Sequence, residues 1–121
     1  MEAKDYRLPD GSCIISEEVI AGIAINAAQE VAGVAGMAVK PNDVRGLMGS
    51  AATKSVRVFN NENETVLDVY VDLKQGVRIP DVAGEVQHGV KVAVQSMTGK
   101  PVTKVNVHVM GIKAEETTEN A

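Results

Sequence analysis

The sequence contains very few aromatic residues. Its 121 residues include two tyrosines, one phenylalanine and no tryptophan, and valine and alanine supply most of the apolar side chains. Valine stiffens strands and alanine favours helices that pack closely. We therefore expect a thin core built from small aliphatic side chains.

Cysteine and long apolar runs are also scarce. The single Cys13 cannot form an internal disulfide, and beside Ile14 and Ile15 we interpret it as a small buried apolar residue. No apolar stretch follows the charged N-terminus as a signal peptide requires. The apolar runs are shorter than the ~18–20 residues of a membrane-spanning helix. We expect a cytoplasmic protein without direct membrane insertion, whose membrane association would come through a partner or an interfacial surface.

Clustered basic residues are missing as well. The net charge is −4, whereas phosphate-backbone binding depends on grouped Lys and Arg. Nucleic acid is therefore an unlikely partner. The length fits one domain, and a charged fraction of 23% is that of an ordinary globular chain.

Two apolar lines at helical spacing predict two helices. Ser16 is placed to cap the first helix, and its expected buried line is Val19, Ile23, Ala27 and Val31, with Ile20, Ala24 and Ala28 beside it. Pro80 suits the start of the second helix and Gly99 its end. The buried line of the second helix is expected to comprise Val82, Val86, Val90 and Val94.

Alternating segments predict the strands. Residues 12–15, 34–39, 55–59, 65–74 and 102–110 have strand patterns. The order strand–helix–strand–strand–strand–helix–strand predicts an α/β (α+β) fold, in which a small mixed sheet of four to five strands carries two amphipathic helices on one face. We divide the chain into a flexible N-terminus (1–10), a single domain (11–112) and a disordered acidic tail (113–121).

The second sheet face is expected to be polar and to form an interaction surface. Its predicted residues are Arg57, Asp68, Tyr70, Asp72, Asn106 and His108. Asp68 and Asp72 lie four strand residues apart, roughly 13 Å, which is too far for the paired carboxylates of a glycosidase. The alternative for the pair is a solvated strand face, on which Arg57 of the neighbouring strand could form a salt bridge to the carboxylates.

No residue pattern points to catalysis. Cys13, His88 and His108 lack the short spacing of metal ligands, and we expect His88 to be exposed. Gly46 and Gly49 have the spacing of a nucleic-acid clamp, and Arg45 and Lys54 flank them. The residues between the glycines are apolar, so this candidate loop is the weaker hypothesis.

Gly22, Gly84 and Gly89 lie inside the predicted helices, where glycine costs ~1 kcal/mol relative to alanine. Either they allow another helix or subunit to approach closely, or the fold accepts them without a role. The sequence leaves both interpretations open.

Two blocks of the sequence resemble the alkaline shock protein family of Gram-positive bacteria. The first is 11–20 (GSCIISEEVI) with 31–36 (VAGVAG). The second joins 76–80 (GVRIP), 97–99 (MTG) and 105–112 (VNVHVMGI). The resemblance extends over residues 8–113.

The resemblance implies a non-enzymatic protein of the envelope stress response that uses no cofactor and no small-molecule substrate. It implies homo-oligomers and binding to a membrane-anchored relative, which would hold the protein at the cytoplasmic side of the membrane. A regulatory module that binds an enzyme of envelope or lipid metabolism is the alternative. The family contributes no catalytic residues.

Overall fold

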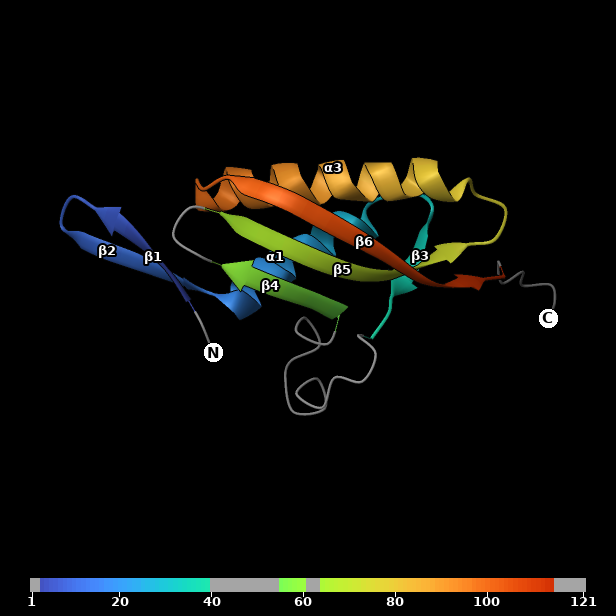
Figure 1. Ribbon diagram of the computed structural model, residues 1–121, viewed down its shortest axis with the longest axis horizontal. Helices are drawn as coiled ribbons and strands as arrows, with labels where there is room; N and C mark the ends of the chain where they lie inside the picture. Colours follow the sequence, from blue (N-terminus) through green and yellow to red (C-terminus); the bar gives the residue numbers. More distant parts are fainter. Residues whose placement is uncertain (1–2, 40–54, 61–63, 115–121) are drawn as a thin grey trace.

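The computed structural model describes residues 3–39, 55–60 and 64–114. Two helices and six strands follow one another along the chain (Figure 1). In order they are β1 (Ala3–Leu8), β2 (Gly11–Ser16), α1 (Glu17–Gln29), β3 (Val34–Met37), β4 (Val56–Asn60), β5 (Thr65–Lys74), α3 (Ile79–Thr98) and β6 (Val102–Lys113).

The main sheet is organised around β5. On one edge, β6 runs parallel to β5 over its whole length. The opposite edge is shared, because β4 pairs antiparallel with residues 65–69 and β3 pairs antiparallel with residues 71–73. This arrangement confirms the predicted mixed sheet with two helices on one face.

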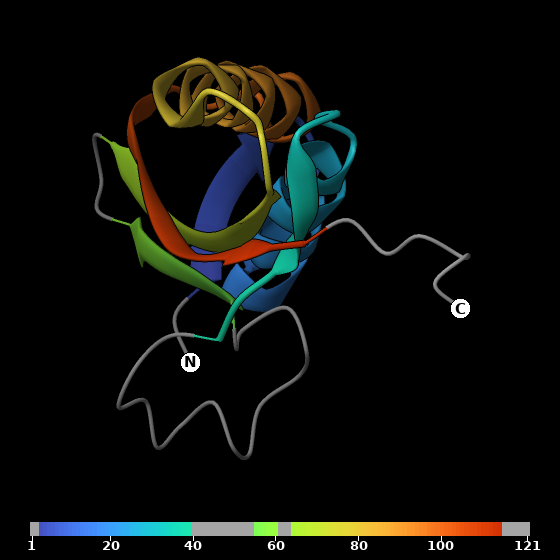
Figure 2. The ribbon, with the colours of Figure 1, turned by 90° about the vertical axis from the view of Figure 1, so that its right-hand side faces the viewer.

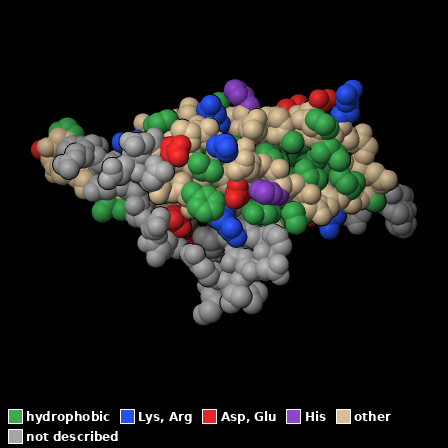
Figure 3. Space-filling model, viewed as in Figure 1, with side chains coloured by type: hydrophobic (Ala, Val, Ile, Leu, Met, Phe, Trp, Pro, Cys, Tyr) green, Lys and Arg blue, Asp and Glu red, His purple; other side chains and the backbone are tan. Residues whose placement is uncertain are grey.

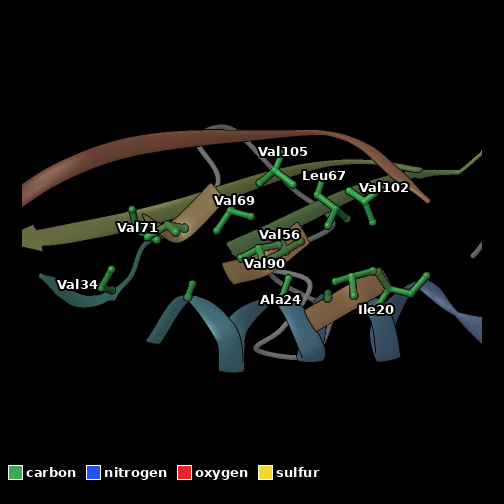
Figure 4. Packing of buried hydrophobic residues seen from close by; sticks show 14 of the residues in the cluster. Ile20, Ala24, Val34, Val56, Leu67, Val69, Val71, Val90, Val102 and Val105 are labelled. Carbon is green, nitrogen blue, oxygen red and sulfur yellow. The ribbon is translucent and has the colours of Figure 1, made fainter. Parts of the chain in front are cut away.

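The core lies between the sheet and the two helices. Every second residue of β5 points toward the helices, and none of them has solvent-exposed surface: Leu67, Val69, Val71 and Leu73. Figure 4 shows strand residues such as Leu67, Val69 and Val105 gathered with Ala24 of α1 and Val90 of α3. Valine and alanine supply most of this buried cluster, as the composition predicts.

Helix α1 begins where the sequence predicts, but its buried line differs. The backbone N–H of Val19 donates to the Ser16 hydroxyl at 3.3 Å, which satisfies one of the free donors of the first turn. Val19 itself is 53% exposed, and the buried residues are Ile20, Ala21, Ala24 and Ala28. The prediction of Val19 as a core residue is wrong because the more alanine-rich side of the helix faces the sheet.

Helix α3 matches its prediction closely. Val82, Val86, Val90 and Val94 are the buried residues, and Pro80 lies in the first turn. Gly99 ends the helix with a left-handed φ of 76°, and its N–H donates to the Gln95 carbonyl. This conformation strains residues with a Cβ and explains the glycine.

The N-terminal residues form a hairpin that the sequence analysis does not predict. Within the expected flexible segment 1–10, β1 pairs antiparallel with β2 in a separate two-stranded sheet. Figure 1 shows this hairpin extending from one end of the molecule. Cys13 is exposed there, so its assignment to the core is wrong, because β2 pairs only with β1 and does not join the main sheet.

Two predicted segments fall partly or wholly outside the described residues. The candidate loop with Arg45, Gly46, Gly49 and Lys54 lies there entirely, as does the tail from residue 115. Strand β6 continues through Lys113, whereas the sequence analysis ended its last strand at residue 110. Among the helices that the structure describes, none has the length and apolar character needed to cross a bilayer.

Candidate interaction surface

The strand registers bring the predicted polar residues together on the sheet face opposite the helices. Arg57 of β4 pairs with Asp68 of β5, and Asn106 of β6 pairs with Asp68 from the other edge. One step along the sheet, His108 pairs with Tyr70. Cross-strand partners project to the same face, so these five side chains form one patch, which we call the polar sheet face.

Asp68 is the centre of this patch. Its Oδ1 accepts a hydrogen bond of 2.8 Å from Asn106 Nδ2, and the Nε2 of His108 lies 3.6 Å from the same oxygen. The Asp68 side chain is only 15% exposed. A carboxylate shielded to this degree needs such partners, because burial without them is costly.

Tyr70 and His108 form a stacked pair beside the carboxylate. Their ring centroids are 4.4 Å apart, with an interplanar angle of 10°. Tyr70 is 7% exposed to solvent, whereas the His108 side chain is 41% exposed. The stacking fixes the imidazole ring, so that one ring edge faces Asp68 while much of the side chain stays open to solvent.

Asp72 belongs to a second pair farther along β5. Its Oδ2 lies 3.9 Å from Lys113 Nζ on β6. Gly111 of β6 is the register partner of Asp72, and a Cβ on it would lie 3.0 Å from Asp72 Oδ1. Asp68 and Asp72 therefore contact different residues, in agreement with their predicted separation along the strand.

Arg57 does not form the predicted salt bridge. It lies opposite Asp68 in the register, but no ion pair joins the two within the described parts of the chain. The guanidinium carbon instead lies 6.0 Å from the centroid of the Phe59 ring, at the limit of a cation–π contact. The printed hydrogen bond to the Asp68 carboxylate comes from Asn106 Nδ2 instead, at Oδ1.

The other predicted chemical groups lie apart from this patch. His88 is exposed on α3, as predicted, and Cys13 lies in the hairpin. Within residues 3–39, 55–60 and 64–114, no group of three or more His, Cys, Asp or Glu side chains could hold a metal ion. The sequence analysis missed Lys113 and Phe59, although the alternation of β4 already places Phe59 on the same face as Arg57.

The sequence comparisons identify the chain's relatives. Residues 7–114 match the family of alkaline shock protein 23, which is described by a cell envelope-related function. The chain belongs to this family. The match confirms the predicted resemblance and covers almost the whole described domain.

Several family relatives come from Gram-positive bacteria. YqhY of Bacillus subtilis is 34% identical over 117 residues, which cover 93% of this chain and 84% of YqhY. YloU of the same organism is 33% identical over 90% of this chain and 94% of its own length. Spy1535 of Streptococcus pyogenes is 35% identical over 88% of this chain and 83% of that protein.

Structural comparison finds variants of the MamM CTD among solved structures. One covers 82% of this chain and 95% of its own chain, with 17% sequence identity and a TM-score of 0.49.

Proposed function

We propose that this protein acts in the envelope stress response without catalysing a reaction, by assembling with copies of itself and binding other proteins. Its family membership supports the connection to the cell envelope. The polar sheet face is the observation that carries the proposal of a binding role. Its central carboxylate and imidazole are held by Asn106 and Tyr70 and already have a fixed arrangement.

The composition of this face suits a protein partner. Exposed apolar side chains lie on the same strands as the polar cluster, since Phe59 is 48% and Met110 47% exposed. Non-obligate protein interfaces combine aromatic and Met side chains with polar groups in this way. Because the polar groups are already ordered, binding would cost little additional side-chain entropy.

We further propose that the protein works at the cytoplasmic side of the membrane through a membrane-anchored relative. No described helix could cross the bilayer by itself, so an anchor partner would supply the attachment. The alternative, regulation of an enzyme of envelope or lipid metabolism, predicts a stoichiometric complex with that enzyme and no self-assembly.

Size-exclusion chromatography with light scattering, over a wide range of protein concentrations, separates these possibilities. We expect the mean mass to rise with concentration. A strict monomer at high concentration that captures one enzyme from lysate at fixed stoichiometry would contradict the assembly proposal and favour the regulatory one.

Single substitutions test both the binding face and the absence of catalysis. Phe59→Ser should weaken partner capture, whereas Val92→Ser, at an equally exposed position on α3 (46%), should not. Asp68→Asn and His108→Gln should each reduce the stress phenotype gradually. Complete loss from either one, with the fold intact, would indicate an enzyme.

A further inference from the structure

Strand β6 has one edge without a partner strand. Its other edge is paired along the whole of β5, and no further strand joins it in the part of the chain that the structure describes. Among the described residues, side chains of α3 form hydrogen bonds only with the start of the free edge. Gln95 Oε1 accepts from the Val102 N–H at 3.0 Å, and Gln87 Nε2 donates to the Val105 carbonyl at 3.1 Å.

The glutamine contact shows which backbone groups remain available. Residues two apart on a strand direct their N–H and C=O groups to the same edge. Val107 and Val109 therefore direct theirs to the edge at which Gln87 reaches Val105. No side chain of α3 bonds to either valine within the described residues. An unpaired edge of this kind can accept another extended chain.

Exposed hydrophobic side chains surround this open part of the edge. Ile79 at the start of α3 is 44% exposed, and Met110 and Ile112 of β6 are each 47% exposed. Val107 and Val109 are only half-buried. Figure 3 shows hydrophobic side chains gathered at this end of the molecule, over α3 and β6. We call the free edge from Val107 to Ile112, with these side chains, the open edge.

The opposite end of the molecule carries the β1–β2 hairpin (Figure 1). Each of its strands has one unpaired edge, and Gly11, Ser12, Cys13 and Ile14 of β2 are exposed, Ile14 by 65%. Figure 2 shows the main body from its other end, with the hairpin strands lying behind the sheet. An isolated two-stranded hairpin is only marginally stable in water, so this one would be stabilised by a further contact.

We propose that the hairpin of one copy adds to the open edge of the next copy, so that the protein assembles head to tail. Charge supports a second copy as the occupant. Neither β2 nor residues 105–112 contains Asp, Glu, Lys or Arg, so the two segments can pair without burying a charge. Because the two surfaces differ and lie at opposite ends, the contact is heterologous, and each added copy leaves one free hairpin and one free edge until the rotation between copies closes a ring. This inference rests on the self-assembly proposed above and specifies its surfaces.

Disulfide crosslinking tests the contact directly, because Cys13 lies on the hairpin. Met110→Cys and Ile112→Cys, each in the protein that retains Cys13, should give a ladder of oligomers on non-reducing gels under mild oxidation. Mass spectrometry should identify the peptide that joins position 13 to position 110 or 112. Cys13→Ser should abolish the ladder. Val92→Cys is the matched control and should crosslink much less.

Two outcomes would overturn the inference. Crosslinking no stronger than that of Val92→Cys would show that the hairpin does not reach the open edge. Dimers that persist after Cys13→Ser, without higher oligomers, would show that β6 pairs with β6 of the second copy.

Lysine substitutions test the same contact in the intact assembly. Ile14→Lys and Ile112→Lys should each raise the concentration for half-assembly by at least about ten-fold, which corresponds to ~1.4 kcal/mol. Val92→Lys should have little effect. Mixing the two deficient variants should give a one-to-one heterodimer that does not grow, because one intact hairpin and one intact edge remain.

The results also distinguish this inference from the proposed function. Assembly that continues unchanged in both lysine variants would refute the hairpin contact and leave self-assembly established. A wild-type protein that stays monomeric at all concentrations would refute both.

Discussion

Gly33 is the position at which the packing of this small core can be tested most sharply. An added Cβ there would lie 2.5 Å from Val82 Cγ2, 3.0 Å from Val82 Cγ1 and 3.3 Å from Val77 Cγ1. Val82 is 8% exposed, and a valine in a helix has one strongly preferred rotamer. The side chain cannot turn away, so Gly33→Ala must displace the start of α3 or the turn before β3.

The expected magnitude combines two opposing effects. Overpacking a core costs about 1–3 kcal/mol. Gly33 does not have a positive φ, so alanine gains back ~0.4–1 kcal/mol by restricting the unfolded chain. We expect a net loss of about 1–2 kcal/mol, which lowers the urea midpoint by roughly 0.5–1 M for an m-value of ~2 kcal/mol/M.

Urea unfolding of four proteins forms the assay: wild type, Gly33→Ala, Val82→Ala and the double variant. Removing the Val82 methyl groups makes room for the new Cβ, so the double variant should be more stable than the sum of the single losses predicts, by at least ~0.5 kcal/mol. Additive losses, or a Gly33→Ala protein as stable as wild type, would refute the assignment of a steric contact.

Substitutions at four other positions test separate parts of the structure. Gly84→Ala and Gly89→Ala should each stabilise the protein by up to ~1 kcal/mol, because a Cβ at either position meets nothing within 4 Å of this chain; reduced assembly despite the stability gain would instead indicate contact with a second subunit. Ser16→Ala should cost about 0.5–2 kcal/mol in urea unfolding through loss of the α1 cap, and Ser16→Asp should restore it. Leu67→Ala should cost about 2–5 kcal/mol, because the residue has no exposed surface; a loss below 1 kcal/mol would contradict its central place in the core.

The features that sequence predicts well are those with a local periodic signal. The four valines of α3 repeat at helical spacing, and β5 alternates strictly, so both buried faces follow from the sequence alone. In α1, apolar residues occupy more than one side of the helix. Periodicity therefore cannot decide between Val19 and Ala21, and packing against the sheet selects the smaller side chain.

Residues that depend on pairing between distant segments were harder to predict. Asp68 and Asn106 are 38 positions apart, and only the parallel register of β5 and β6 makes them partners. Both residues belong to the predicted face, but the sequence analysis considered Arg57 and not Asn106 as a partner of Asp68. Two register irregularities in β6, the second next to Gly111, also shift the alternation before Lys113. The sequence analysis ended this strand at residue 110, so Lys113 was not assigned to this face.

The pairing of the hairpin and the position of the open edge could not be predicted from the sequence for the same physical reason. Sequence patterns reveal a strand through the side chains that it buries. Strand β2 leaves Gly11 to Ile14 exposed, so its apolar pattern predicts a strand but does not show which segment packs against it. The free edge of β6 is likewise a property of backbone groups, which every residue carries. In a single copy, both features present backbone hydrogen-bonding groups or apolar side chains that have no partner. A second copy is the simplest source of that partner. Assembly should therefore protect the amide hydrogens of Val107 and Val109 from exchange, while those of α3 stay unchanged.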